Sequence, residues 1–206
     1  MSMMYPLPAP ARRPEEGRIY QWFYDHGIRP NHISLVRLGF VPIVILLIGL
    51  STSVWIAILA AVVFLIAALT DRWDGELARR SGQISESGKF LDTLIDKSLI
   101  IGTLAAIAYF HYPGDFRWWL AVGLVAVPEI ISVLLRSWIK WHRPTVDLAA
   151  QWWGKVKMVA QIVLVASLIV INPSDIGVFI LWTTVVTTVV ADIATISRLI
   201  QEYRKS

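Results

Sequence analysis

Cysteine is absent from this sequence of 206 residues, and charged residues make up only 17% of it. Without cysteine the chain forms no disulfide bridge and offers no thiolate to a metal. Soluble domains carry about a quarter of their residues as charged side chains, so this low charge argues against a soluble protein. Hydrophobic residues make up 56% of the chain, and its mean hydropathy is +0.59. Because they form runs near the roughly 20 residues that cross a bilayer, we predict an integral membrane protein.

The N-terminal thirty residues lack such a run. Their first part, MSMMYPLPAPARRPEEG, is too polar and too rich in proline for a cleavable signal peptide. Residues 15–28 repeat aromatic and apolar side chains at roughly helical spacing, which predicts an amphipathic helix on the membrane surface, with a disordered tail as the alternative. We therefore divide the chain into residues 1–30, the tail with its interfacial helix, and residues 31–206, a six-helix transmembrane domain.

Six hydrophobic segments are separated by turn-forming clusters. These turns are Ser-Thr-Ser at 51–53, His-Tyr-Pro-Gly-Asp at 111–115 and Asn-Pro-Ser-Asp at 172–175. Asn31 is predicted to cap the first helix, because asparagine accepts a backbone hydrogen bond at such positions. The predicted fold class is all-α, with six transmembrane helices at about residues 32–50, 54–80, 88–110, 117–141, 150–171 and 176–200.

Positive charge is nearly missing from one end of these helices. Of the nineteen lysines and arginines, only Arg117 lies near the three turns just named. Cytoplasmic ends of membrane helices are enriched in these residues, so both termini are predicted to be cytoplasmic, in a multi-pass protein of the bacterial inner membrane. The net charge of +4 suits an acidic lipid surface, and no nucleic-acid-binding motif competes with that interpretation.

Four aspartates stand in one short stretch between two hydrophobic segments: Asp71, Asp74, Asp92 and Asp96. An ionised carboxylate near hydrocarbon is costly unless it is paired, hydrated or bound to a cation. Asp71 and Asp74 are three residues apart, and Asp92 and Asp96 are four apart, so each pair shares a helix face. Two helices joined by a short turn can direct both pairs into one cavity. The spacing therefore predicts an oxygen-rich site for divalent cations.

The same stretch contains a longer pattern of eight fixed residues. Written out, it is Asp71-x2-Asp74-Gly75-x2-Ala78-Arg79-x8-Gly88-x3-Asp92-x3-Asp96. This pattern resembles the signature of the CDP-alcohol phosphotransferase family, also called the CDP-alcohol phosphatidyltransferases, and every fixed position is filled. The six-span topology is similar as well. The resemblance implies a homodimeric enzyme that moves a substituted phosphoryl group from a CDP-linked donor to an alcohol and releases CMP.

The resemblance also implies a role for each of these signature residues. Asp71, Asp74 and Asp92 would bind one or two Mg²⁺ or Mn²⁺ ions, which prefer carboxylate and phosphate oxygens. Asp96 would act as the general base that activates the alcohol and would also contact a metal ion. Small residues would let the nucleotide approach closely, and an arginine would make a forked contact with the diphosphate. The donor-binding residues would be Asp71, Gly75, Ala78, Arg79 and Gly88.

The acceptor alcohol is indicated by fewer residues. Arg136, Lys155 and Lys157 lie near the cytoplasmic ends of the fourth and fifth spans, and we expect them to bind an anionic acceptor. Gly-Lys-Val-Lys-Met at 154–158 is similar to a stretch of the phosphatidylglycerophosphate synthase branch. That similarity favours transfer of a phosphatidyl group from CDP-diacylglycerol to glycerol 3-phosphate. Asp92-Thr93-Leu94 and Arg136-Ser137 depart from that branch, which leaves inositol phosphate or another alcohol as the alternative.

Two more acidic residues lie inside predicted spans, where ionisable groups are either functional or paired. Glu129 lies seven residues before Arg136 on the same helix face and is expected to be a buried structural partner or part of the site. Asp192 either lines the cavity or pairs with Arg198 or another cation. The four histidines do not cluster in the sequence, and we assign them no role.

Two other classes of membrane protein combine aspartates with divalent cations. An intramembrane prenyltransferase carries its aspartates in two separate motifs, and this chain lacks the second. A divalent-cation channel or transporter would leave Gly75, Ala78, Arg79 and Gly88 unexplained, and an arginine beside a cation path is unfavourable. Both hypotheses are weaker than phosphatidyl transfer to a polar alcohol.

Overall fold

The computed structural model describes residues 30–81, 86–142, 152–171 and 175–205, and this part of the chain is helical apart from short turns. The all-α class is confirmed for these residues, whereas the predicted interfacial helix at residues 15–28 lies outside them. The elements are α2 (Pro30–Gly49), α3 (Val54–Ser81), α4 (Glu86–His111), α5 (Phe116–His142), α6 (Trp152–Ile171) and α7 (Asp175–Lys205).

The helices begin and end within two residues of the predicted bounds, except that α7 continues to Lys205. The prediction that Asn31 caps the first helix is wrong. Asn31 lies inside α2, which includes Pro30. Proline is tolerated in the first turn of a helix, because the N–H that it lacks has no partner there.

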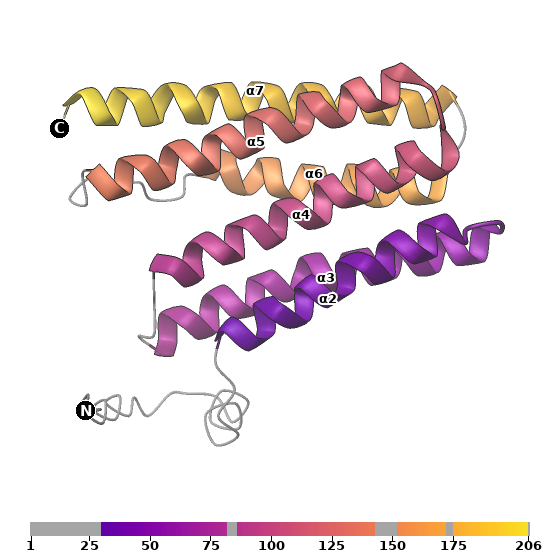
Figure 1. Ribbon diagram of the computed structural model, residues 1–206, viewed down its shortest axis with the longest axis horizontal. Helices are drawn as coiled ribbons and strands as arrows, with labels where there is room; N and C mark the ends of the chain where they lie inside the picture. Colours follow the sequence, from indigo (N-terminus) through magenta and orange to yellow (C-terminus); the bar gives the residue numbers. More distant parts are fainter. Residues whose placement is uncertain (1–29, 82–85, 143–151, 172–174, 206) are drawn as a thin grey trace.

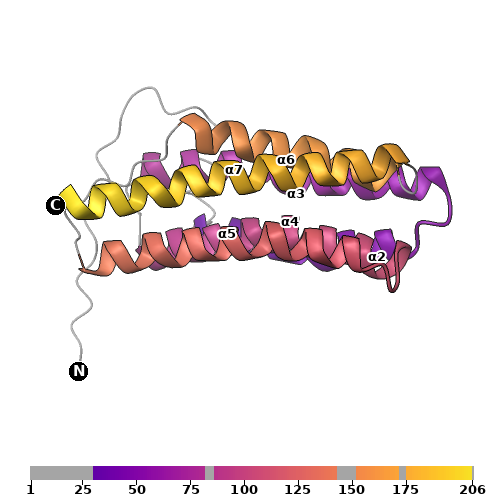
Figure 2. The same ribbon diagram turned by 90° about the horizontal axis from the view of Figure 1, so that it is seen from above.

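Successive helices alternate in direction, so the connections fall at two opposite ends of the bundle (Figure 1). At one end, called the turn end, α2 meets α3 and α4 meets α5. At the other, called the motif end, α3 terminates and α4 begins. Seen from above, α2, α4 and α5 form one layer, and α3, α6 and α7 form a second (Figure 2). Neighbouring helices close a ring in the order α2, α4, α5, α7, α6 and α3.

Small residues allow the helices to approach one another closely. Ala60 and Ala67 lie seven residues apart on one face of α3; both are fully buried, as is Phe64 between them. At the turn end, Gly49 of α2 lies against the Phe110 ring of α4, and a Cβ at Gly49 would come within 3.0 Å of that ring. The missing side chain therefore lets the two helix ends meet.

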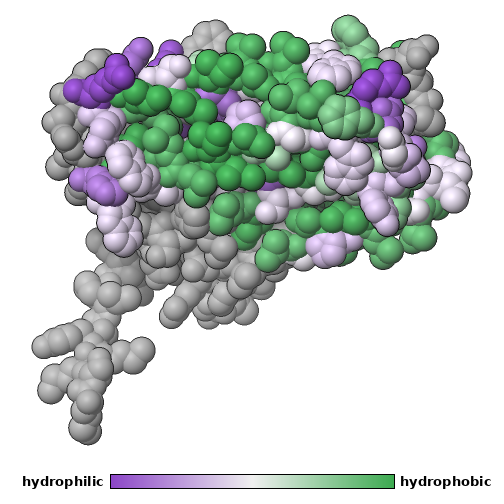
Figure 3. All heavy atoms as spheres, turned by 45° about the horizontal axis from the view of Figure 1, so that its top comes forward, coloured by the Kyte–Doolittle hydropathy of each residue, from purple (hydrophilic) through white to green (hydrophobic). Residues whose placement is uncertain are grey.

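Large apolar side chains cover the outside of the bundle. Trp55 and Phe179, for example, are 76% and 73% exposed. Figure 3 shows hydrophobic residues over the middle of one face, with hydrophilic residues gathered towards its ends. Within the described residues, four of the six predicted spans are long and apolar enough to cross a membrane: Thr93–His111, Phe116–His142, Gly154–Ile171 and Ile176–Arg204. The apolar stretches described for α2 and α3, Leu38–Gly49 and Val54–Thr70, are shorter.

The turn between α4 and α5 gives Arg117 a local partner. The Arg117 guanidinium donates hydrogen bonds to both carboxylate oxygens of Asp115, at 3.2 and 3.1 Å. Asp115 also caps α5, because its Oδ1 accepts a hydrogen bond from the Arg117 backbone N–H at 3.0 Å. These hydrogen bonds, chiefly those from the side chain, hold the pKa of the Asp115 carboxyl below its usual value. Gly114 precedes the cap with φ of +85°, a left-handed conformation that favours glycine.

Candidate active site and a buried charge cluster

The four signature aspartates lie at matching levels on α3 and α4. Asp71 lies ten residues before the end of α3, and Asp96 lies ten residues after the start of α4. Asp74 and Asp92 lie seven and six residues from the same ends. The two helices run antiparallel (Figure 1), and each residue advances about 1.5 Å along a helix. The backbone therefore carries one aspartate of each helix about 15 Å from the motif end and the other about 10 Å from it.

The other signature residues belong to the same two helices. Gly75, Ala78 and Arg79 lie in the last two turns of α3, and Gly88 lies in the first turn of α4. All eight positions are therefore helical, as the spacing predicts. The side chains of all eight lie outside the described residues, so their predicted contacts stay predictions.

The chemistry of this donor set fits a divalent cation. Four carboxylates supply only hard oxygen ligands, which Mg²⁺ and Mn²⁺ prefer and which a soft metal would not select. Their backbone positions, at matching depths on two consecutive helices, are compatible with ligands contributed by both helices. A site with few protein ligands also leaves coordination positions for substrate phosphates.

The three predicted acceptor-binding residues have different surroundings. Arg136 on α5 and Lys155 on α6 are exposed, and both lie towards the motif end of their helices. The Lys157 side chain is only 9% exposed. Its ammonium group lies 2.9 Å from Glu129 Oε1 and 2.5 Å from Asp192 Oδ1. Lys157 is therefore held inside the bundle, whereas Arg136 and Lys155 are accessible from outside.

Lys157 belongs to a group of four ionisable side chains that we call the charge cluster: Lys97, Glu129, Lys157 and Asp192. They come from α4, α5, α6 and α7, one from each helix. Glu129 and Asp192 are both buried, with side chains 1% exposed, and Lys97 Nζ lies 2.5 Å from Glu129 Oε2. When all four are ionised, two positive charges balance two negative ones. Such balance is needed because an unpaired charge in a low-dielectric interior is strongly destabilising.

Two uncharged side chains complete the cluster on its inner side. The Gln161 amide donates hydrogen bonds to Glu129 Oε1 and to the Thr188 hydroxyl, both at 2.9 Å. Gln161 and Thr188 are fully buried. Among the described atoms of this group, Gln161 Oε1, Asp192 Oδ2 and Glu129 Oε2 are buried without a hydrogen-bond partner, although Glu129 Oε2 is ion-paired with Lys97.

The sequence predicted some of this cluster and missed the rest. Asp192 pairs with a cation other than Arg198, which was one of the two predicted alternatives. Glu129 is a buried partner, as expected, although its cations are Lys97 and Lys157. Lys97 received no role, yet a lysine inside a predicted span is itself a signal, because such residues are costly unless paired.

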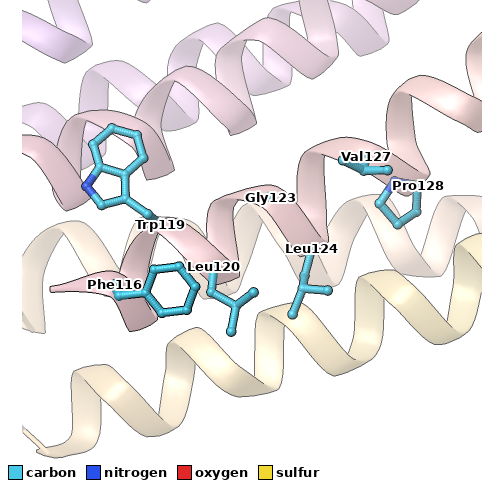
Figure 4. A pocket seen from close by; sticks show the side chains of 7 residues that line it. All are labelled: Phe116, Trp119, Leu120, Gly123, Leu124, Val127 and Pro128. Carbon is cyan, nitrogen blue, oxygen red and sulfur yellow. The ribbon is translucent and has the colours of Figure 1, made fainter.

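A separate apolar groove of about 440 Å³ runs along the outer face of α5. Figure 4 shows Phe116, Leu120 and Leu124 pointing to the same side of this helix, with Gly123 leaving space between its larger neighbours. The groove shares no lining residue with the charge cluster or with the signature. It is therefore a separate apolar feature of the bundle's outer surface.

A bundle of long apolar helices, with acidic residues grouped at one end and paired charges inside, defines a helical protein of the membrane-spanning class. Comparison with known proteins then assigns the family. The model of the CDP-alcohol phosphatidyltransferase family matches residues 28–190, and this chain belongs to that family. It is accordingly a phosphatidyltransferase enzyme.

Curated relatives show the same relationship. A protein of Escherichia coli strain K12 is 35% identical over 143 residues, which cover 68% of this chain and 75% of the relative. A protein of Pectobacterium atrosepticum is 33% identical over 142 residues with the same coverage. A third, from Sodalis glossinidius, is 33% identical over 150 residues, or 71% of this chain and 79% of its own. All three are named CDP-diacylglycerol–glycerol-3-phosphate 3-phosphatidyltransferase.

Proposed function

We propose that this enzyme transfers a phosphatidyl group from CDP-diacylglycerol to glycerol 3-phosphate and releases CMP. The observation that carries this proposal is the placement of all eight signature residues on α3 and α4, inside the region matched by the family. The acceptor is supported by the names of the relatives and by Gly-Lys-Val-Lys-Met at 154–158. Residues 31–206 would form the catalytic domain.

Asp71, Asp74, Asp92 and Asp96 would hold one or two Mg²⁺ or Mn²⁺ ions. The ions supply charge neutralisation for the diphosphate as the leaving phosphate departs. Donor binding involves Asp71 and Arg79, with the guanidinium contacting diphosphate oxygens. Gly75, Ala78 and Gly88 keep the approach to the helix backbone open for the nucleotide.

Asp96 would act as the general base. Its carboxylate accepts the proton of the acceptor hydroxyl, whose oxygen then attacks the phosphorus that carries diacylglycerol. The bond from this phosphorus to the bridging diphosphate oxygen breaks, and CMP leaves. Exposed Arg136 and Lys155 are suited to draw an anionic acceptor towards the motif end, while Lys157 stands further inside.

The proposal is tested by CMP release from CDP-diacylglycerol by the purified protein. We expect release that requires Mg²⁺ or Mn²⁺ and glycerol 3-phosphate, and that stops with EDTA and returns when the ion is restored. Inositol phosphate, inositol and serine are tested as alternative acceptors in parallel reactions. Release with inositol phosphate alone would replace the acceptor and keep the transfer chemistry. Divalent-cation flux through liposomes without CMP release would support the transporter hypothesis instead.

We further propose that all six helices cross the bacterial inner membrane, with both chain termini and the motif end in the cytoplasm, and that the enzyme is a homodimer. The orientation is supported by the scarcity of lysine and arginine at the turn end. The homodimer is supported by the family resemblance.

Single-cysteine labelling, measured on the chain after its purification, tests this orientation, because the chain has no other cysteine to react. Thr52→Cys places a thiol in the exposed α2–α3 turn, and Gln201→Cys places one on the exposed side of α7 near the other end. A membrane-impermeant maleimide applied to spheroplasts should label Thr52→Cys and should label Gln201→Cys only after permeabilisation. The opposite pattern would reverse the orientation.

A further inference from the structure

Apart from Lys157, which was predicted to bind the acceptor, the charge cluster has no role in the proposed reaction, yet it includes the residue that follows the proposed base in the sequence. Lys97 follows Asp96 in α4, so the two residues belong to the same helical turn. The Lys97 side chain is 20% exposed, and its one ion-pair partner within the described residues is Glu129. Burying charged groups inside an apolar bundle is costly, and ionisable residues within membrane helices commonly belong to functional sites.

Glu129 is the member of the cluster that joins two helices of the site. Its Oε2 contacts Lys97 of α4 at 2.5 Å, and its Oε1 contacts Lys157 of α6 at 2.9 Å. Asp192 contacts Lys157 at 2.5 Å and, within the described side chains, forms no ion pair with Lys97, whose charge acts on it only at longer range. Within the described side chains, the cluster therefore links α4 to α6 through Glu129 alone.

The carboxylate of Glu129 is itself held in one place. The buried Gln161 amide donates to Glu129 Oε1 at 2.9 Å and also to Thr188 of α7. A carboxylate with one hydrogen-bond donor, two ion-pair partners and 1% exposure has little freedom to move. It is thus a rigid anchor for Lys97, in contrast to a surface ion pair, whose side chains are free to separate.

A rigid anchor at Lys97 has consequences for Asp96. Residues of one helical turn move together, because each is fixed to the next by the backbone and its hydrogen bonds. A displacement of about 1 Å at a reacting group is enough to lower a rate about a hundredfold. The position of Asp96 relative to an alcohol bound near α6 therefore depends on the contact between Lys97 and Glu129.

We propose that Glu129 is a positioning residue for phosphatidyl transfer: through its ion pair with Lys97 it fixes the turn of α4 that carries Asp96. This inference rests on the proposed function, because it takes Asp96 as the base. Asp192 serves as the internal comparison. It contributes a carboxylate to the same cluster but forms no ion pair with α4 within the described side chains.

The test compares Glu129→Gln with Asp192→Asn in the full-length enzyme. Both variants remove one negative charge from the cluster and keep the shape of the side chain. Glu129→Gln should lower kcat for CMP release by about 10- to 100-fold per folded molecule, with less than about a threefold change in KM for CDP-diacylglycerol. Asp192→Asn should lower kcat by less than about threefold, although both variants lose stability. Folded protein is quantified by size exclusion and tryptophan fluorescence.

A second comparison tests whether Glu129 acts on kcat through Lys97. Lys97→Met should reproduce the loss of kcat seen in Glu129→Gln, and the double variant should be no slower than the slower single variant, because both remove one contact. Additive losses would overturn the inference, as would equal losses of kcat in Glu129→Gln and Asp192→Asn. An unchanged kcat in folded Glu129→Gln would reduce the cluster to a structural role.

These outcomes remain separate from those of the proposed function. A wild-type enzyme that requires another alcohol contradicts the acceptor, while the comparison among variants stands with that alcohol. A wild-type protein that releases no CMP with any alcohol overturns both proposals. Normal wild-type activity together with indistinguishable cluster variants overturns this inference alone.

Discussion

Asp96→Asn is expected to lower the rate of CMP release by about a thousandfold while the protein stays folded. General acid–base catalysis contributes about 10²- to 10⁴-fold to enzymatic rates, and asparagine cannot accept the hydroxyl proton. The amide is also a weaker ligand for a hard cation than the carboxylate. The measurement is initial CMP release at saturating CDP-diacylglycerol, glycerol 3-phosphate and Mg²⁺, with wild-type protein purified in parallel.

Asp115→Asn is the matched control for this prediction. The substitution is chemically identical, but Asp115 lies in the turn between α4 and α5, at the opposite end of the bundle from the signature. Its carboxylate is occupied by Arg117. We expect its rate to remain within about twofold of wild type, since Asp115 lies far from the proposed site and asparagine can also cap a helix. A rate for Asp96→Asn within tenfold of wild type would exclude Asp96 as the base.

Lys157→Met is expected to lower the free energy of unfolding by about 3–5 kcal/mol, the range found when one partner of a buried ion pair is removed. The substitution leaves Asp192 without its described cation and Glu129 with Lys97 alone. Methionine fills a similar volume, so loss of packing contributes little. Unfolding in detergent by increasing denaturant is followed through the fluorescence of the ten tryptophans.

Lys155→Met provides the comparison, because it is the same substitution two residues away on an exposed side of α6. Its effect on stability should stay within about 0.5 kcal/mol. The double variant Lys157→Met/Asp192→Asn should be more stable than Lys157→Met, because it removes one charge of each sign and leaves Lys97 paired with Glu129. A loss in Lys155→Met equal to that in Lys157→Met would show that burial of the cation is not the cause.

The helices could be predicted from the sequence because their ends are marked locally. Ser-Thr-Ser at 51–53 and the segment that includes Gly114 interrupt apolar runs, and the observed helices stop beside both. Asn31 was misassigned because a capping residue and a residue of the first turn are distinguished by backbone conformation, which composition does not encode. Pro30 is equally compatible with the first turn of the helix, so a helix that begins at Pro30 fits the sequence as well as one capped by Asn31.

The signature could also be placed in advance, since its residues follow helical spacing along two consecutive segments. The partners in the charge cluster could not. Lys97 and Glu129 are 32 positions apart, and Lys157 and Asp192 are 35 apart, so their contacts depend on how the ring of helices closes. Helical spacing placed Glu129 and Arg136 on one face, but Glu129 is buried whereas Arg136 is exposed. Which part of a face meets another helix is a property of packing.

The order of charges along the chain has a consequence for biogenesis. Consecutive helices form hairpins: α4 with α5 contains Lys97 and Glu129, and α6 with α7 contains Lys157 and Asp192. Each hairpin has one ion pair of its own, in addition to the contact between Lys157 and Glu129 that joins them. A hairpin that leaves the translocation machinery can thus carry these two charges into lipid as a pair, before its neighbour has been synthesised. Pairing within each hairpin lowers the free-energy cost of inserting these ionised groups into the membrane.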